Sequence, residues 1–365
     1  MPNFNGQLNS NEIFAALYNM IISQQVFANN LESKKNSLVE MGRVDGSMYG
    51  DTKLYYATDA LKSAKWGNDA EAQNLLKLHR PKAPDVQAIK IDTFRYIPIT
   101  IDNYLTKRAW MDEGAFSSFN SVMLGWMRET KEVYDITTYN AFIGTAKSDK
   151  ATENITIDLT TATTGLTGDE KARTEAQVIG EQVSNMLVNL EDISRDYNDY
   201  GNLRSYSRDK VIFVWNSKAI AGIQKRDLPT IYHKDGIIDK FGEYVLPHRF
   251  FGTVNTDAKV GDGTTIRSLI EQDVTKSGAT DEHVFAGDLI PKGYNALAGT
   301  TYTVDTNVLF KVYHIGPNSV PYMSGFEAET SFFNPLSLTE NHYLIWGHNT
   351  LEYLKNYPFI TVKKA

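Results

Sequence analysis

The sequence contains no cysteine among its 365 residues. This absence excludes disulfide bonds, cysteine-ligated metals and thiol catalysis, and it fits folding inside a cell. No run approaches about 18 consecutive apolar residues, so we expect no membrane-spanning segment. The N-terminus also lacks a basic region followed by a long apolar core, so we expect no signal peptide.

Positive charge is in the minority. Lysine and arginine total 37 against 44 aspartates and glutamates, which gives a net charge of −7. A tight grip on nucleic acid along the whole chain is therefore not expected, because such binding depends on cations that neutralise phosphates. Aromatic residues make up 12% of the chain, with 20 tyrosines and 17 phenylalanines. This content favours extensive protein–protein contact, although a large mixed core explains it equally well.

Short catalytic motifs are also absent. There is no HExxH pair, no GxSxG and no GxxxxGK[ST]. Asp281, Glu282 and His283 form a carboxylate–imidazole cluster, but they lie in a loop rich in glycine, serine and threonine, where charges are usually solvated. His342 and His348 lie six residues apart, on one face of an expected strand, with no third metal ligand nearby. We therefore predict no catalytic residues, no cofactor and no metal site.

Two further patterns are interpreted as ordinary surface features. The stretch Gly261-Asp262-Gly263 faintly resembles a phosphate-binding loop, but it lacks the strand and helix that such a loop requires, and we expect a turn. A modestly basic interval is diluted by aspartates, and we interpret it as surface charge rather than as a patch for nucleic acid or acidic helices. Its members are Arg204, Arg208, Lys210, Lys225 and Arg226.

The most informative segment runs from Ile91 to Gly144. Ile91–Ile101 is rich in β-branched and aromatic residues in partial alternation, which predicts a strand. After a polar turn, residues recur at steps of three and four and predict one helix over residues 115–143, roughly 40 Å long. A helix of this length is typical of a structural support against which other parts of the chain pack. Its predicted stripe is Phe116, Phe119, Met123, Trp126, Thr130, Val133 and Thr137.

The segment before this strand has a different character. A capping pattern that starts at Asn9 predicts a helix to about Asn30. Residues 33–90 then combine glycine, proline and dense charge with short strand-like pieces at Met48–Tyr49 and Leu54–Ala57. Such a stretch buries little apolar surface alone, so we interpret it as a long hairpin-like excursion that needs support from another subunit.

The second half of the chain predicts an α/β layer and a closing segment. Val211–Trp215 is a compact apolar strand, and a short helix follows at Lys218–Gln224. The aromatic-rich residues 326–360 are expected to pair with the Ile91–Ile101 strand, so that the middle of the chain is inserted into one discontinuous domain. A second amphipathic helix is predicted over Arg173–Asp196, with a stripe of Ala176, Ile179, Val183, Met186, Leu187, Leu190 and Ile193.

The order of these parts resembles a tailed-bacteriophage major capsid protein of the Hong Kong 97 fold. Residues Tyr104–Phe116 resemble the lead into that family's spine helix, and Tyr134–Tyr139 resemble its later turns. The strand and helix of Val211–Gln224 resemble the family's axial domain, and Trp346–Phe359 resembles a terminal strand of its peripheral domain. The resemblance covers almost the whole chain and rests on order and spacing, because the fold has no universal short motif.

The resemblance implies an α+β, Hong Kong 97-like fold in four parts. Residues 1–34 would form an N-arm, and residues 35–90 an extended β-loop. Residues 91–170 and 322–365 would form a discontinuous peripheral domain with the long spine helix, and residues 171–321 an inserted axial α/β domain. Some relatives cross-link neighbouring subunits through a lysine and an asparagine. Neither position can be matched to this chain, so we predict no cross-link.

The function that the resemblance implies is structural. Many copies would assemble as hexamers and pentamers into an icosahedral shell around phage double-stranded DNA, in the virion and, during assembly, in the host cytoplasm. The implied partners are other copies, a scaffolding protein, a portal and a decoration or head-fibre protein. The negative charge would keep contact with packaged DNA weak, and no membrane is involved. Candidate inter-subunit contacts are Phe14 and Tyr18 in the arm and Tyr49, Tyr55, Tyr56 and Trp66 in the loop.

Two alternative functions stay open at this point. A two-domain α/β hydrolase or transferase would use Asp281, Glu282 and His283, but residues 33–90 would be an unusual unsupported stretch in a monomeric enzyme. A tail-tube or adhesin subunit would also self-assemble. Electron microscopy of the purified protein distinguishes the three hypotheses as shells, small discrete particles or tubes.

Overall fold

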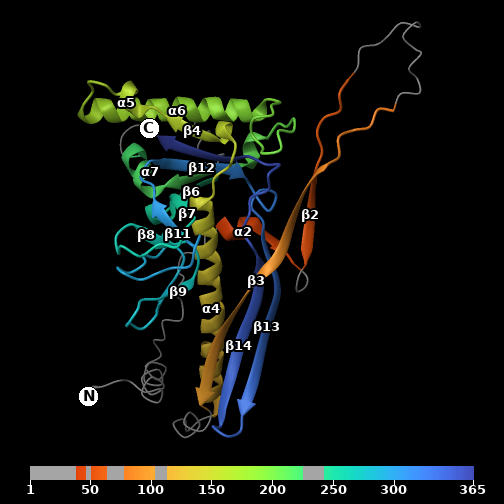
Figure 1. Ribbon diagram of the computed structural model, residues 1–365, viewed down its shortest axis with the longest axis vertical. Coiled ribbons are helices and arrows are strands. Elements are labelled where there is room, and N and C mark those ends of the chain that lie inside the picture. Colours follow the sequence, from red (N-terminus) through yellow and green to blue (C-terminus); the bar gives the residue numbers. More distant parts are fainter. Residues whose placement is uncertain (1–37, 47–50, 64–77, 103–112, 225–241) are drawn as a thin grey trace.

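The described part of the chain forms two five-stranded sheets, a smaller β unit and one long helix that contacts all of them (Figure 1). The computed structural model describes residues 38–46, 51–63, 78–102, 113–224 and 242–365. Within these ranges, no helix is long and apolar enough to span a membrane. The expected helix over residues 9–30 and the strand-like piece Met48–Tyr49 lie outside the described residues.

The first sheet is elongated and has the strand order β1-β13-β14-β3-β2. Its strands are β1 (Arg43–Asp45), β2 (Thr52–Ala57), β3 (Asp85–Asp102), β13 (Tyr322–Asn334) and β14 (Thr339–Asn349). β2 and β3 pair in antiparallel fashion, which confirms the expected hairpin, whereas β1 lies at the opposite edge of the sheet. β14 pairs with β3 along nearly its whole length, so the aromatic-rich segment does join the early strand as predicted.

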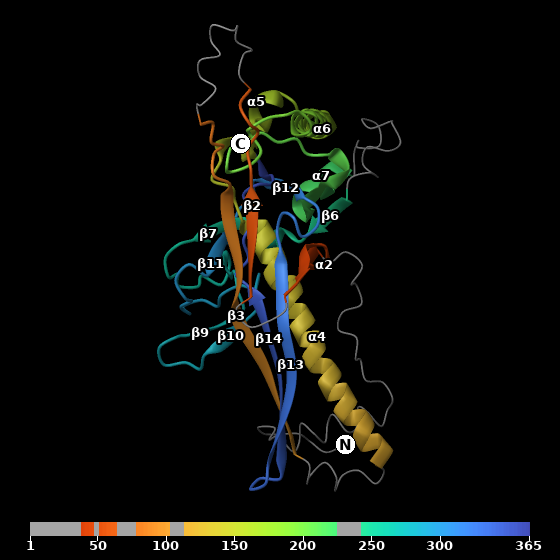
Figure 2. The same cartoon turned by 90° about the vertical axis from the view of Figure 1, so that its right-hand side faces the viewer.

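β3 alternates between an inward and an outward face. Ile89, Ile91 and Ile101 point inward and are buried, while Phe94 and Tyr96 point outward and are exposed. The period of two therefore decides which side of the sheet meets the long helix. Figure 2 shows that helix running beside the sheet.

The long helix is α4 (Glu113–Thr145), with 33 residues and a length of about 50 Å. It is longer than predicted, and its predicted stripe is wrong in phase from Trp126 onward, although Met123 is buried as predicted. Trp126 is 49% exposed, and the neighbouring position Met127 is buried instead. The error arises because the buried face includes Lys131. This residue is only 7% exposed, and its ammonium group pairs with Glu327 at 3.0 Å. A pattern based on hydrophobicity misses a buried lysine that has a partner.

α4 packs against both large sheets. In its first half, Met127 and Tyr134 contact Leu344 and Trp346 of β14. In its last turns, Tyr139 and Ile143 belong to a core that also contains residues of the second sheet. The short helix α2 (Leu38–Gly42) contributes Leu38 and Val39 to this core, and the segment before β13 contributes Val320. The helix thus connects two cores, as expected of a structural support.

The second sheet has the order β4-β15-β12-β5-β6. Its strands are β4 (Asn154–Ile157), β15 (Phe359–Lys364), β12 (Val308–His314), β5 (Val211–Asn216) and β6 (Gly242–Leu246). The last strand of the chain, β15, pairs with β12 and β4, so the end of the aromatic-rich segment does not pair with the early strand. β3 pairs instead with β14 over Ile91–Asp102 and with β2 over Asp85–Lys90.

β5 is buried on both faces and divides its side chains between two cores. Val211, Phe213 and Trp215 face one core, and Ile212 and Val214 face the other. This explains why the strand is apolar at successive positions rather than at alternate ones.

Helices cover the first of these two cores. They are α6 (Gly168–Glu191) and α7 (Ser217–Gln224), and α5 (Leu159–Ala162) lies beside α6 (Figure 1). The predicted stripe of α6 is buried as expected except at Ile193, which is 64% exposed because the helix ends two residues earlier.

A smaller β unit packs against the side of α4. It contains the sheet β7 (Gly252–Asn255), β11 (Thr301–Val304) and β8 (Ile266–Ser268), and the hairpin β9 (Gln272–Val274) and β10 (Glu282–Val284). The approach between the unit and the helix is close. A Cβ atom at Gly144 would lie 2.1 Å from the carbonyl oxygen of Phe250, so only glycine fits there.

Candidate inter-subunit contact site

Of the six predicted contact residues, two fall in the described part of the chain. Tyr55 and Tyr56 are adjacent on β2 and point to opposite faces. Tyr55 packs on a cluster of its own subunit that includes Ile89 and Leu354, and burial raises the pKa of its hydroxyl. Tyr56 is 63% exposed, so of these two residues it is the one available to another molecule. Phe14, Tyr18, Tyr49 and Trp66 lie outside the described residues.

Tyr56 belongs to an exposed apolar row. Leu54 on the same face of β2 is 52% exposed, and Val86, which is paired with Tyr56 across the hairpin, is 50% exposed. Beyond the paired region, Leu61 and Leu78 are each more than three-quarters exposed. The hairpin projects away from the body of the molecule (Figure 1). Exposed apolar side chains on a projecting hairpin are typical of a surface that is covered in an assembly.

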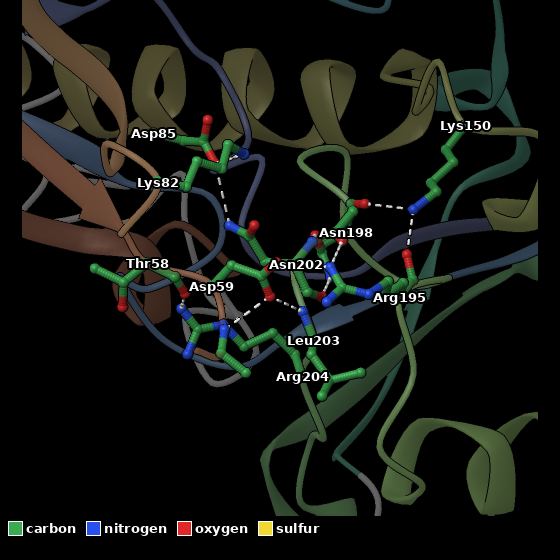
Figure 3. Close-up of polar contacts among 12 residues, drawn as sticks. Thr58, Asp59, Lys82, Asp85, Lys150, Arg195, Asn198, Asn202, Leu203 and Arg204 are labelled. Carbon is green, nitrogen blue, oxygen red and sulfur yellow. Dashed lines mark hydrogen bonds and ion pairs between the residues drawn. The ribbon is translucent and has the colours of Figure 1, made fainter. Parts of the chain in front are cut away.

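The outgoing strand of the hairpin is held where its pairing ends. The Asp59 carboxylate accepts hydrogen bonds from Arg195 Nη1 at 2.8 Å and from the backbone N–H of Leu203 at 2.9 Å (Figure 3). These bonds hold the pKa of Asp59 well below its usual range. Arg204 Nη2 donates to the carbonyl oxygen of Thr58 at 2.8 Å.

The returning strand is held by the same segment. Asn202 Nδ2 donates to the Asp85 carboxylate at 3.3 Å, and Lys82 pairs with that carboxylate at 3.0 Å (Figure 3). Residues 194–204, which we term the root segment, thus contact both strands of the hairpin. Sequence analysis assigned Arg204 to ordinary surface charge, and this is corrected here, because the guanidinium binds a residue 146 positions earlier in the chain.

A second exposed apolar surface lies at the far end of the first sheet. The turn between β13 and β14 carries Leu336, which is 96% exposed, and Phe332 nearby is 64% exposed. Leu338 adopts a φ of 53°, a left-handed conformation that is strained for a leucine. Two apolar surfaces therefore lie toward opposite ends of the long axis of the molecule, the hairpin at one and this turn at the other (Figure 1).

The predicted cluster of Asp281, Glu282 and His283 is not formed as such. His283 bonds with Asp273 at 2.7 Å and with Glu271 at 2.9 Å, so its partners are not the adjacent Asp281 and Glu282. Burial acts to lower the pKa of His283, but the bonds with the two carboxylates raise it overall. Within the described ranges, no group of three or more metal-ligating side chains is brought together.

The other candidate motifs have structural roles. His348 is buried, and its Nε2 is hydrogen-bonded to the Tyr134 hydroxyl at 2.8 Å, whereas the His342 ring lies 3.7 Å from Glu340. The Asp262 carboxylate accepts three backbone N–H bonds from Thr264, Thr265 and Ile266, so the glycine-flanked stretch is the turn that was expected. Among the basic residues, Arg208 forms an ion pair with Glu191 at 2.8 Å.

One groove offers room for a small molecule but carries no catalytic pair. It has a volume of about 1060 Å³ and lies between α5, α6, α7 and the last residues. Its lining contains no histidine, and its Glu175 lies 4.0 Å from Lys171 in an ion pair along α6. The groove therefore does not support the hydrolase or transferase alternative.

Matches to known proteins agree with the resemblance found in the sequence. A model of the family described as Phi29-like phage major capsid protein matches residues 3–361. No curated protein matches the sequence. The capsid structure of Staphylococcus phage Andhra matches with a TM-score of 0.57 and 11% identity over 93% of this chain and 87% of that one. A structure of the head fibre and inner core protein of native bacteriophage P68 matches with a TM-score of 0.56 and 11% identity, over 88% and 82%. At this identity the structures show a shared fold only.

Proposed function

Because this chain belongs to the family of Phi29-like phage major capsid proteins, we propose that its copies assemble as hexamers and pentamers into an icosahedral shell around phage double-stranded DNA. The chain is a major capsid protein, so it is located in the virion and associates with itself. The number and arrangement of the copies, and the identity of the packaged nucleic acid, are parts of the proposal.

The observation that carries the proposal is the projecting hairpin with its exposed row of Leu54, Tyr56 and Val86. We propose that this row lies on a neighbouring copy. Burial of apolar surface contributes about 25 cal/mol per Å² before the costs of ordering are subtracted, so a row of this kind gives a weak contact by itself. Repetition of the contact around a closed shell would make the whole assembly stable.

We further propose the Hong Kong 97 form of the fold. Residues 1–34 would be the N-arm, residues 35–90 the extended loop, residues 91–170 and 322–365 the discontinuous peripheral domain, and residues 171–321 the inserted axial domain. The shared fold with the Andhra capsid and the path of α4 beside the first sheet support this division. One change is needed, because β4 and β15 belong to the same sheet as β5 and β12 and should be counted with the axial domain.

The proposed role is structural and involves no catalysis. Proposed partners are a scaffolding protein, a portal and a decoration or head-fibre protein, with assembly in the host cytoplasm. The net charge of −7 supports weak contact with packaged DNA, because the wall of the shell and the phosphates repel each other. No membrane is part of the proposal.

Electron microscopy of the purified protein tests this function. The chain is expressed alone and together with the other head proteins of its phage, and the products are separated by sedimentation. We expect closed shells with five-fold vertices. Tubes would favour the tail-tube alternative, and small discrete particles at every concentration in both preparations would contradict the proposal.

A further inference from the structure

We propose that the root segment, residues 194–204, is a clamp that fixes the direction in which the hairpin leaves its own subunit before any neighbour binds. The proposal rests on the proposed function in one respect, because the direction matters for assembly only if the hairpin reaches another copy. The clamp itself is a property of the isolated chain. The clamp and its role in assembly can therefore be tested separately.

The clamp lies where the hairpin would otherwise pivot. The β2–β3 ladder ends at the pair Ala57–Asp85, and residues 58–63 and 78–84 have no strand structure. A two-stranded ribbon without a third strand is marginal in water. The contacts of Thr58, Asp59 and Asp85 with the root segment occur at or next to this last pair. Both strands are therefore held at the position where the ladder stops supporting them.

The root segment is itself well anchored. Ser194 and Arg204 exchange two backbone hydrogen bonds of 2.9 Å, which close the segment into a loop. Asn198 Nδ2 donates to the Asn202 carbonyl oxygen, and the Asn202 N–H donates to Asn198 Oδ1, both at 2.8 Å; these two side chains are almost fully buried. A loop with a buried and reciprocally bonded asparagine pair at its centre can hold a partner in a single orientation.

The clamp is also tied to the end of the long helix. Lys150, five residues after the end of α4, donates through its ammonium group to the carbonyl oxygens of Asn198, at 2.8 Å, and Arg195 (Figure 3). Arg195 in turn donates to Asp59 and to the carbonyl oxygen of Gly201. A continuous set of polar contacts thus runs from Lys150, in the segment that follows α4, through the root segment to the hairpin.

Several bonds are needed at this position because a single exposed ion pair contributes little. Asp59 accepts from a guanidinium and from a backbone N–H of an anchored loop, and bonds of this charge-assisted kind are shorter and stronger than neutral ones. Arg204 and Asn202 add bonds on each strand. Removal of the Asp59 carboxylate should therefore free the outgoing strand while leaving the buried cores intact.

A distance measurement in the free subunit tests the clamp. Because the chain has no cysteine, spin labels can be placed at Leu78→Cys on the hairpin and Ser184→Cys on α6 without other substitutions, and both positions are exposed. We expect a single narrow distance distribution in the parent chain and one at least about twofold broader in Asp59→Ala. The matched control is Glu191→Gln, which removes the carboxylate of the Arg208 ion pair at the same 2.8 Å distance but does not touch the hairpin.

The outcomes separate the clamp from the proposed function. Equal widths in the parent chain and in Asp59→Ala would overturn the clamp. A broader distribution together with several-fold fewer closed shells, or with shells of mixed size, would support both the clamp and its role in assembly. A broader distribution with unchanged shells would overturn that role. If the parent chain gives a narrow distribution but forms no shells under any condition, the clamp stands and the proposed function fails.

Discussion

The ammonium nitrogen of Lys311 lies 2.5 Å from the carbonyl oxygen of Ala146, the residue that follows the end of α4, and donates a hydrogen bond to it. Lys311 stands in the middle of β12, is 2% exposed and also donates to the Thr361 hydroxyl at 3.0 Å. A cation at the C-terminal end of a helix interacts favourably with its unpaired carbonyl groups. This single side chain therefore joins the long helix to the second sheet.

Burial of Lys311 predicts a specific pH dependence. Burial lowers the pKa of the ammonium group from 10.5 to about 7. Between these pH values the unfolded chain binds one more proton than the folded chain. The free energy of unfolding therefore rises by about 1.4 kcal/mol per pH unit, and this added stability is lost as the pH falls toward 7. We expect Lys311→Met to lack this rise. Urea unfolding of the free subunit at several pH values between 7 and 10.5, with Lys171→Met as a surface control, measures it. Parallel curves for Lys311→Met and the parent would contradict the prediction.

Glu153 predicts that the free energy of unfolding falls with rising pH, over a lower pH range. Burial raises the pKa of this carboxyl to about 8, and the nearby Asp199 carboxylate adds to the effect. The folded state then holds a proton that the unfolded state releases above about pH 4.5. Stability is therefore lost as the pH rises toward 8, by about 1.4 kcal/mol per unit. We expect Glu153→Gln to gain stability relative to the parent as the pH increases from 5 to 8. Urea unfolding at pH 5 and pH 8 tests this, and a constant difference between the two chains would refute it.

Two glycines of α4 predict opposite responses to the same substitution. At Gly125, no atom lies within 4 Å of an added Cβ, so Gly125→Ala should stabilise the helix by about 0.5–1 kcal/mol. At Gly144, the added Cβ would meet the Phe250 carbonyl oxygen at 2.1 Å. Gly144→Ala should therefore destabilise the subunit by about 1–3 kcal/mol, because the backbone of the β unit must move. Thermal unfolding of the two variants measures the difference, and an increase in stability for both would show that the close approach is not required.

The adjacent Tyr55 and Tyr56 predict a separation between folding and assembly. Tyr55→Ala should lower the free energy of unfolding by about 1–3 kcal/mol, because its ring packs on Ile89 and Leu354. Tyr56→Ala should change it by less than about 0.5 kcal/mol, since the side chain is 63% exposed, but should reduce the yield of closed shells several-fold. Urea unfolding of the free subunit and shell yield by sedimentation measure the two effects. Normal shell yield from Tyr56→Ala would remove this residue from the interface.

Much of the fold follows from local periodicity. β5 was predicted from five successive apolar residues and exists within one residue of the predicted bounds, and α6 was predicted from a stripe with a period of three and four and exists with both ends five residues earlier than predicted. β3 was predicted from partial alternation, and its alternation in the structure is more regular than the sequence indicates, because Phe94 and Tyr96 are apolar but face outward. Patterns of this kind depend only on neighbours in the chain.

The contacts between the hairpin and the root segment could not be predicted from local periodicity. The partners of Asp59 and Thr58 are 136 to 146 residues away in sequence, and no local pattern connects them. The predicted phase of α4 was wrong from Trp126 onward for the same reason, since the buried Lys131 pairs with Glu327, which comes from a strand 196 residues later. The choice between Tyr55 and Tyr56 required the register of β2 against β3, which places adjacent tyrosines on opposite faces.

The packing of α4 on both large sheets limits how a subunit can adjust to its position. A shell built from both hexamers and pentamers, as proposed, places identical chains at sites of unequal local geometry, so some part of the chain must differ from site to site. Rotation of one sheet against the other would disrupt the contact of Tyr134 with Trp346 or the core that Ile143 shares with Phe359, because the same helix contributes to both cores. We therefore expect the body and the clamped base of the hairpin to be the same at every site, and the adjustment to be confined to the hairpin beyond its contacts with the root segment and to the Leu336 turn.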